Sequence, residues 1–243
     1  MRSRPASVVA AVAVAIAIAL AGSLLACGDY LDARAEGALR EALVRVVGPA
    51  ASYDVSVTGA SIDATRFERV RFVGTRVVRE RAPVLDRLEL ELRGVAIDRQ
   101  EKRLTALAGA TAALRIRAGD LADYLRERGW FEDARVALAP PDRITINGVP
   151  KIGGAVLQLR DGVELQGRLV AQGAQLRLVV DAVRIGDLQA PPLVRALLER
   201  AVNPLIDAGA YPVAARIDAV AVDGDSVVIA ASGSGLADPV VRP

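Results

Sequence analysis

A few residues in this chain have types and spacings that could do chemistry. Glu89 and Glu91 lie two positions apart, and a pair of carboxyl groups can act as general acid and general base in hydrolysis. Leucines alternate with these glutamates through Leu88–Arg93, a pattern typical of an antiparallel strand with one face in water. We therefore interpret the two glutamates as the solvated side of a sheet rather than as a catalytic pair.

Two other segments could bind ions. Asp223 and Asp225 flank Gly224, but the segment lacks the oxygen ligands that complete a calcium loop, so a hairpin turn is the better interpretation. Residues 151–154 place a lysine before two glycines, in the wrong order and length for a phosphate-binding loop. The two glycines are more typical of a bend or bulge beside a strand.

The composition excludes further classes of site. The chain has no histidine, which removes the commonest general base and metal ligand, and its single cysteine cannot form an internal disulfide. The formal net charge of +2 comes from Arg2 and Arg4, so the rest of the chain is close to neutral and lacks the basic stripe that nucleic-acid binding needs. We predict no catalytic residue, no metal site, no cofactor and no nucleic-acid partner.

The single cysteine, Cys27, ends an apolar run that begins behind Arg2 and Arg4. A basic start, an apolar middle and a small residue before the cleavage point make a secretory signal. The order Leu24-Leu25-Ala26-Cys27 resembles a bacterial lipobox, in which the cysteine receives a lipid and becomes the mature N-terminus. We predict a signal peptide over residues 1–26 and lipidation at Cys27.

Two alternatives remain for this segment. Ala6–Ala26 is long enough, at about 20 residues, to span a bilayer uncut. The segment could also direct secretion without a lipid. All three interpretations export the chain, and we expect it on the periplasmic side of the cell envelope, held at the membrane through its N-terminus.

Three segments have the pattern of helices. Leu31–Val47 repeats apolar residues at helical spacing and is ended by Gly48-Pro49. A short helix is predicted over Leu121–Arg128, with Asp120 as its N-cap and Gly129 in the left-handed conformation that follows a helix. A third helix is predicted from Pro191 to about Val202. Trp130 either dips into a membrane interface or folds back onto the preceding helix, and we favour the second.

Strand-like alternation covers most of the remaining chain. The predicted strands are residues 53–58, 69–72, 88–93, 112–117, 155–159, 163–169, 176–180, 216–222 and 226–230. Turn signals at 160–162, 172–173 and 223–224 join neighbouring strands into hairpins. Adjacent strands joined by tight turns predict an antiparallel α+β fold, with one domain over residues 27–233 and a tail over 234–243.

Several of these features, taken in order, resemble one known family. They are the helix Ala38–Leu43, the strand-to-helix passage Arg117–Leu125, the helix end Asn203–Asp207, Tyr211-Pro212 and the closing hairpin Ile217–Ile229. In this order they are similar to the LmeA-like phospholipid-binding proteins of bacterial envelopes. The chain departs from that pattern at Tyr211, where leucine is expected, and in its lipobox.

The resemblance implies a strongly curved antiparallel sheet wrapped around a long amphipathic helix, of the tubular lipid-binding type. It also implies binding of phospholipid, or of glycolipid acyl chains, without turnover. Six leucines are expected on the inward faces of the first helix and of the strands, as a candidate wall for an acyl chain. They are Leu39, Leu43, Leu90, Leu157, Leu165 and Leu178.

The residues themselves leave the interior open to two interpretations. Aromatic residues make up only 3% of the chain, so few bulky rings fill its interior, which favours an apolar cavity. Most alternating strands nevertheless cover an ordinary closed core. A structural envelope lipoprotein that acts through protein contacts is therefore the main alternative, and an enzyme acting on envelope glycolipids is the third.

Overall fold

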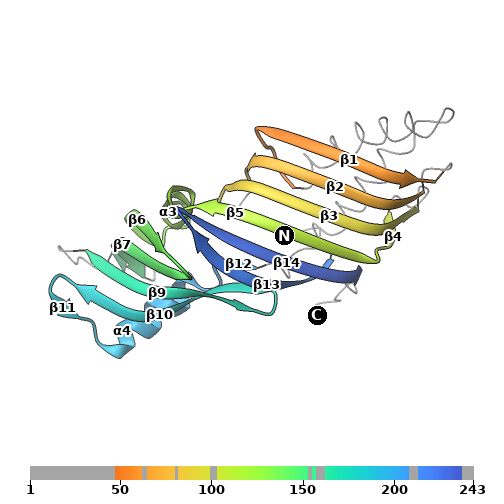
Figure 1. Ribbon diagram of the computed structural model, residues 1–243. Helices are drawn as coiled ribbons and strands as arrows, with labels where there is room; N and C mark the ends of the chain where they lie inside the picture. The colour runs from red at the N-terminus through yellow and green to blue at the C-terminus, as the bar shows by residue number, and fades with distance from the viewer. Residues whose placement is uncertain are drawn as a thin grey trace, which may run out of the picture.

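The computed structural model describes residues 47–61, 65–79, 82–98, 103–152, 155–156, 162–207 and 213–236. These residues form an elongated molecule in which two antiparallel sheets of seven strands follow one another along the long axis (Figure 1). Every strand pair in the described residues is antiparallel. The predicted antiparallel pairing of the strands is therefore confirmed.

The first sheet is built from the two ends of the described chain. Its strand order is β1-β2-β3-β5-β14-β13, with the short β4 paired to β3. The strands are β1 (Ser52–Ala60), β2 (Arg66–Val77), β3 (Leu85–Asp98), β4 (Arg103–Ala106), β5 (Gly109–Arg117), β13 (Val213–Asp223) and β14 (Ser226–Leu236). The predicted turn at 223–224 is confirmed, since Asp223 pairs with Ser226 and Gly224 has a φ of 61°. β14 continues to Leu236, inside the segment predicted as a tail.

The second sheet comes from the middle of the chain. Its strand order is β11-β10-β9-β7-β6, with β12 paired to β10 and β8 paired to β7. The strands are β6 (Phe131–Ala139), β7 (Arg143–Ile152), β8 (Ala155–Val156), β9 (Val163–Gln172), β10 (Gln175–Ile185), β11 (Leu188–Gln189) and β12 (Ile206–Asp207). The β9–β10 hairpin turns at Gly173, which has a φ of 60°, as its turn signal predicts.

One predicted hairpin was wrong. The sequence pattern pairs residues 155–159 with residues 163–169, but in the described residues β8 pairs with the end of β7 and β9 pairs with the rest of β7. β6 and β7 were not predicted at all. The pairing with β7 sets Ile146 beside Leu165, and both side chains are fully buried, so burial of apolar area selects this partner over the nearer one.

Helix α3 (Ala118–Glu127) starts before its predicted N-cap. The strand β5 runs directly into it, the N-cap position is Arg117, and the Ala118 amide donates to the Asp225 carbonyl at 2.8 Å. Asp120 was therefore wrongly predicted as the cap. It lies in the first turn, 8% exposed, where its carboxylate accepts a 2.5 Å hydrogen bond from Arg76 and favours the positive end of the helix.

Trp130 folds back onto α3, as predicted. Gly129 ends the helix with a φ of 67°, and the Trp130 amide donates to the Leu125 carbonyl at 3.1 Å. The indole ring meets Tyr124 edge-on with 5.7 Å between ring centroids, and the Arg128 guanidinium lies 5.1 Å from the indole centroid. The indole ring of Trp130 therefore packs against side chains at the end of α3.

Helix α4 (Pro192–Val202) confirms the predicted third helix. It begins with proline in its first turn and buries Leu198 and Val202. The predicted helix over 31–47 lies outside the described residues except for Val47, as does Cys27. A long helix wrapped by the sheet is not confirmed, because α3 and α4 are both short. No helix in the described residues is long and apolar enough to cross a membrane.

Candidate functional site

One face of the first sheet carries rows of apolar side chains that cross several strands. Direct partners in an antiparallel ladder share a face, so each row can be followed from the strand register. One row runs Val57, Val70, Leu92, Ala110 and Gly233, and the next runs Val55, Phe72, Leu90, Ala112, Ala231 and Ile217. The alternation in β1–β3 and β5 thus becomes a continuous apolar face.

The size of the side chains changes along these rows. β1, β2 and β3 contribute valine, phenylalanine and leucine, whereas β5 and β14 contribute only small residues. We call these small residues the small-residue strip: Ala110, Ala112, Ala231 and Gly233. Leu90 and Leu92 border the strip on β3, and Ile217 borders it on β13. In these two rows the face is therefore lower at β5 and β14 than on either side.

Exposure differs along the same face. Phe72 and Leu92 are buried, while Leu90, Ala112 and Ala231 keep partial exposure. Partial exposure of apolar side chains on the inner face of a sheet means that their packing is incomplete. Leu90, Ala112 and Ala231 therefore keep accessible apolar area on this face, whereas Ala110 is buried in the distal core.

The buried residues form two clusters. The central core joins both helices to both sheets and includes Leu125, Leu165, Leu178, Leu198 and Ile229. The distal core lies at the far end of the first sheet, and its members are Val55, Val57, Phe67, Val70, Phe72, Leu92, Val95, Leu107 and Ala110. Among the described residues, no member of α3, α4 or the second sheet belongs to the distal core.

The opposite face of the first sheet is charged. Glu89 accepts hydrogen bonds from Arg87 at 2.7 Å and from Arg71 at 3.4 Å, and Glu91 accepts one from Arg93 at 2.6 Å. The hydrogen bond from Arg87 is the main reason that the pKa of Glu89 is lowered, and Arg93 does the same for Glu91. Both carboxyl groups thus lie among arginines on the face opposite the apolar rows, as the alternation predicts.

The second acidic pair forms a turn. Asp223 is paired with Arg115 across the sheet, and Asp225 accepts a 2.9 Å hydrogen bond from the Ser226 hydroxyl. Within the described residues, no three acidic side chains lie close enough together to hold a metal ion. The hairpin interpretation of this segment is therefore confirmed.

The structure separates the leucines that were predicted to line one wall. Leu165 and Leu178 lie fully buried in the central core, whereas Leu90 packs at the edge of the distal core. Leu39, Leu43 and Leu157 lie outside the described residues. The prediction that these side chains contact a lipid stays a prediction, and of the set Leu90 is the one beside the small-residue strip.

Leu178 is held on several sides. The Asn203 side-chain amide donates to its carbonyl at 2.8 Å and accepts from its amide at 2.8 Å. A Cβ atom added at Gly167 would lie 2.8 Å from the Leu178 side chain, so this leucine already fills the space over that glycine. The packing around Leu178 is that of a closed core.

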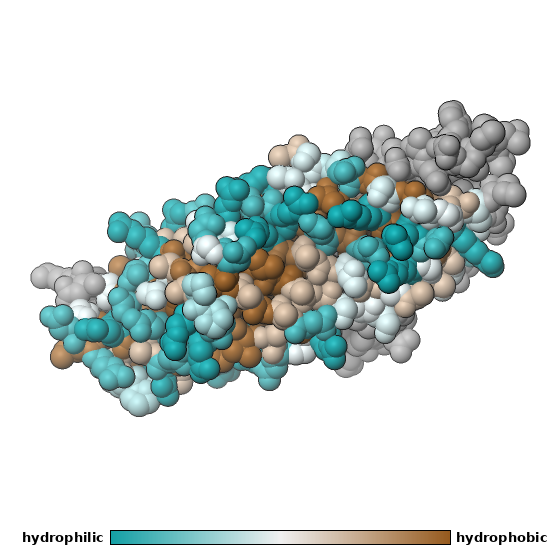
Figure 2. Space-filling view, in the orientation of Figure 1, coloured by the Kyte–Doolittle hydropathy of each residue, from teal (hydrophilic) through white to brown (hydrophobic). Residues whose placement is uncertain are grey.

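Sequence reasoning missed Ala112 and Ala231. The signal was present as two runs of small residues, Ala110–Ala113 and Ala230–Gly233. Figure 2 adds that, on the visible side, hydrophobic surface gathers at the middle of the molecule, around the place where β13 packs on β9 and the two sheets meet. On this side of the molecule the apolar surface therefore gathers where the two sheets meet.

The comparison with protein families gives one match. The model of the LmeA-like phospholipid-binding family covers residues 26–232 of the 243, and the chain belongs to that family. No curated protein and no solved structure matches it.

Proposed function

From membership of the LmeA-like phospholipid-binding family, we propose that this protein binds the acyl chains of a phospholipid, or of a glycolipid, on the apolar face of its first sheet. It holds the lipid and catalyses no reaction on it. Glu89 and Glu91, the two carboxylates whose spacing suggests catalysis, are paired with arginines. Such a partner is recognised by burial of methylene groups, each of which contributes about 0.8 kcal/mol.

The small-residue strip is the observation that carries this proposal. Over two rows its side chains are shorter than Leu90 on one side and Ile217 on the other, and an acyl chain laid along these rows would bury their exposed apolar area. The partial exposure of Leu90, Ala112 and Ala231 supports the same placement, because these atoms still have apolar area to bury.

The proposal includes the exported, membrane-tethered state that the N-terminal sequence predicts. A lipid on Cys27 would hold the protein at the periplasmic side of the envelope, close to the lipids it binds. Mass spectrometry of the N-terminal peptide tests this point, with added acyl mass on Cys27 as the expected result. An unmodified peptide that contains both Arg4 and Cys27 in the mature protein would disprove cleavage and lipidation together.

Lipid extraction and mass spectrometry of the purified protein test the binding site. Ala112→Trp places an indole in the small-residue strip and should abolish or shorten the acyl chain that is retained. Ala113→Trp is the matched control, because Ala113 is the next residue on the same strand, is exposed and lies on the opposite face. The control should retain the lipid content of the parent.

Two results would contradict the proposal. Equal loss of lipid in both variants would mean that the strand, rather than the strip, had been disturbed. A parent protein that carries no lipid, with Ala112→Trp strongly destabilised, would instead support the structural envelope lipoprotein. The full burial of Leu165 and Leu178 in a closed core is the observation that favours that second candidate.

A further inference from the structure

A third row of apolar side chains lies beside the small-residue strip, on the side of the central core. The strand register continues the two rows described above with the next inward residues, which are Tyr53, Gly74, Leu88, Leu114, Ile229 and Val220. Leu114 is two residues beyond Ala112 on β5, and Ile229 is two residues before Ala231 on β14. Large side chains therefore return on both strands where the strip ends.

Ala112 and Ala231 lie between the two cores. Among the described residues, neither alanine is buried, and neither is among the side chains that pack in the central or the distal core. Leu90 packs against the distal core, whereas Leu114 and Val220 pack against the central core. All five side chains keep partial exposure, and we call them the inter-core surface.

Buried side chains border the inter-core surface along the sheet. On the distal side, Leu92 and Ala110 of the first row are buried. On the central side, every member of the fourth row is buried, and these members are Ile116, Val227 and Val222. Val47 packs against both cores, so the cores lie close together. The accessible apolar area is thus confined to two rows, whose spacing along the strands is about 7 Å.

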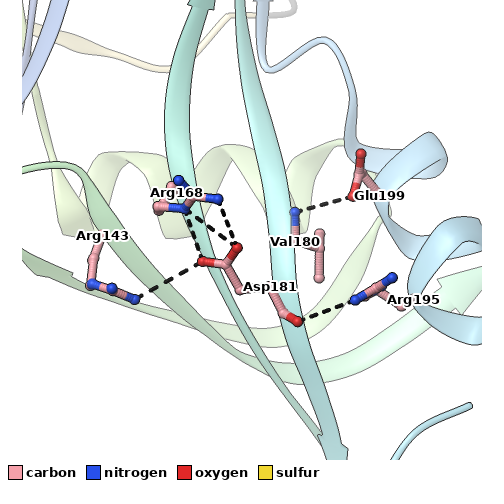
Figure 3. Close-up of polar contacts among 6 residues, drawn as sticks. All are labelled: Arg143, Arg168, Val180, Asp181, Arg195 and Glu199. Atoms are coloured by element: carbon pink, nitrogen blue, oxygen red, sulfur yellow. Dashed lines mark hydrogen bonds and ion pairs between the residues drawn. The ribbon is translucent and has the colours of Figure 1, made fainter. Parts of the chain in front are cut away.

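The inward face of the second sheet is closed instead. Along the middle of β9 and β10 the inward side chains are buried, namely Val163, Leu165, Leu169, Leu176, Leu178, Val180 and Val183. Helix α4 packs on β10 and is fastened to it by polar side chains (Figure 3). Glu199 accepts a 3.1 Å hydrogen bond from the Val180 amide, and Arg195 donates to the Asp181 carbonyl at 3.4 Å. A short helix thus covers the second sheet at the level where the first sheet keeps accessible area.

We propose that Leu114 and Val220 form the central wall of the acyl-chain site and select straight acyl chains over methyl-branched ones. This assignment rests on the proposed function, because it concerns the same site. An acyl chain laid on Ala112 and Ala231 contacts Leu90 on its distal side, and it contacts Leu114 and Val220 on its central side. It then buries the accessible apolar area of the whole inter-core surface.

Selection follows from what stands behind each wall. Leu90 is backed by the distal core, and Leu114 and Val220 are backed by the central core. A methyl branch widens the chain, and packed side chains yield to an added methyl group only at a cost. In an apolar site, one added or missing carbon changes discrimination by about tenfold or more.

Competition between two lipids tests the assignment. The full chain, purified in detergent, is incubated with equal amounts of dipalmitoyl- and diphytanoyl-phosphatidylcholine, whose chains have the same backbone length but differ in methyl branches. Unbound lipid is removed, and the retained lipids are measured by mass spectrometry. The parent should retain the straight-chain lipid at least about tenfold over the branched one. In Leu114→Ala this ratio should fall by about tenfold, and in Val220→Ala, which removes fewer carbons, it should fall less.

Ile185→Ala is the matched control. Ile185 is also partly exposed and packs against the same central core, but it lies at the end of β10 that pairs with β11. Its loss should leave the ratio of the two lipids unchanged.

Three results would overturn the assignment while lipid binding itself stands. They are equal retention of both lipids by the parent, an unchanged ratio in both Leu114→Ala and Val220→Ala, and an equal fall of the ratio in Ile185→Ala. Retention of neither lipid by the parent would instead contradict the proposed function, and the assignment with it.

Discussion

The central and distal cores are made from the same alternating pattern but are closed differently. In the central core α3 and α4 pack on strands of both sheets, and Leu125, Leu165 and Leu178 are completely buried. The described members of the distal core come from the first sheet and from the segment before β5. At β5 and β14 this core borders alanines that are partly exposed. Alternation thus predicts which face is apolar but does not tell what lies on that face.

The difference separates two roles within one chain. A fully packed cluster fixes the fold, and it has no space for a ligand. An apolar face with short side chains and remaining exposure can accept one. Substitutions in the two regions should therefore differ in their effect on stability and on lipid content.

The largest effect is expected at Leu178. Leu178→Ala should lower the free energy of unfolding by roughly 2–5 kcal/mol, because the surrounding side chains cannot move far enough to fill the cavity that it leaves. Denaturant unfolding of lipid-free and lipid-loaded protein measures the loss, which should be the same in both. A loss that shrinks in the lipid-loaded protein would place Leu178 at the lipid site and break the contrast between the cores.

Asn203 should be next in size. Its side chain satisfies the amide and the carbonyl of Leu178 and also donates to the Glu199 carbonyl at 2.8 Å. Asn203→Ala leaves these partly buried groups unpaired, at a cost of about 1–3 kcal/mol. Hydrogen exchange of the Leu178 amide measures the change locally, and unchanged protection of that amide would show that water replaces the side chain.

Leu90 should show the opposite behaviour. Leu90→Ala should reduce the stability of the lipid-free protein by clearly less than Leu178→Ala does, because one side of Leu90 is still exposed. The same variant should change which acyl chains are retained, as measured by mass spectrometry of extracted lipid. A stability loss equal to that of Leu178→Ala, with lipid content unchanged, would make the distal core an ordinary closed one.

The smallest effect is expected on the charged face. Arg87 and Arg71 lower the pKa of Glu89 below its ordinary value of 4.5, so the ionised form is favoured by folding. The resulting stability is present above pH 4.5 and is lost as the pH falls through the lowered pKa. Because the ion pair between Glu89 and Arg87 is exposed, Glu89→Gln should lower the free energy of unfolding by only about 0.5 kcal/mol at neutral pH. Unfolding midpoints from pH 7 to pH 3 should show the parent and the variant converging in acid.

Much of the fold could be predicted from local pattern. Period-two alternation located β1, β2, β3, β5, β9, β10, β13 and β14, and turn glycines such as Gly173 and Gly224 fixed two hairpins. Proline and helical spacing located α4, and Gly129 placed the end of α3. These signals are local, since each depends on residues within one element or its turn.

The partners of the strands could not be predicted in the same way. β9 pairs with β7 rather than with β8, because Ile144 and Ile146 of β7 supply the apolar side chains beside it. The sequence pattern had not predicted β6 or β7. The small-residue strip required knowing that Ala112 lies beside Ala231, more than a hundred residues later in the chain. Alternation within a strand carries no information about the register between distant strands. The sequence therefore predicted Leu90 at the candidate site but not the alanines beside it.

The pairing of β5 with β14 also sets the order in which the molecule can fold. Arg117 pairs with Ser226, so the second sheet and both helices are an insertion between two neighbouring strands of the first sheet. During synthesis from the N-terminus, the apolar rows of β1–β5 stay exposed until the β13–β14 hairpin has been made, because that hairpin completes the first sheet. Folding of the inserted half brings Ala118 and Asp225 together and shortens the loop that β5 and β14 must close. We therefore expect the first sheet, with its proposed lipid-binding face, to be completed only after the inserted half has folded.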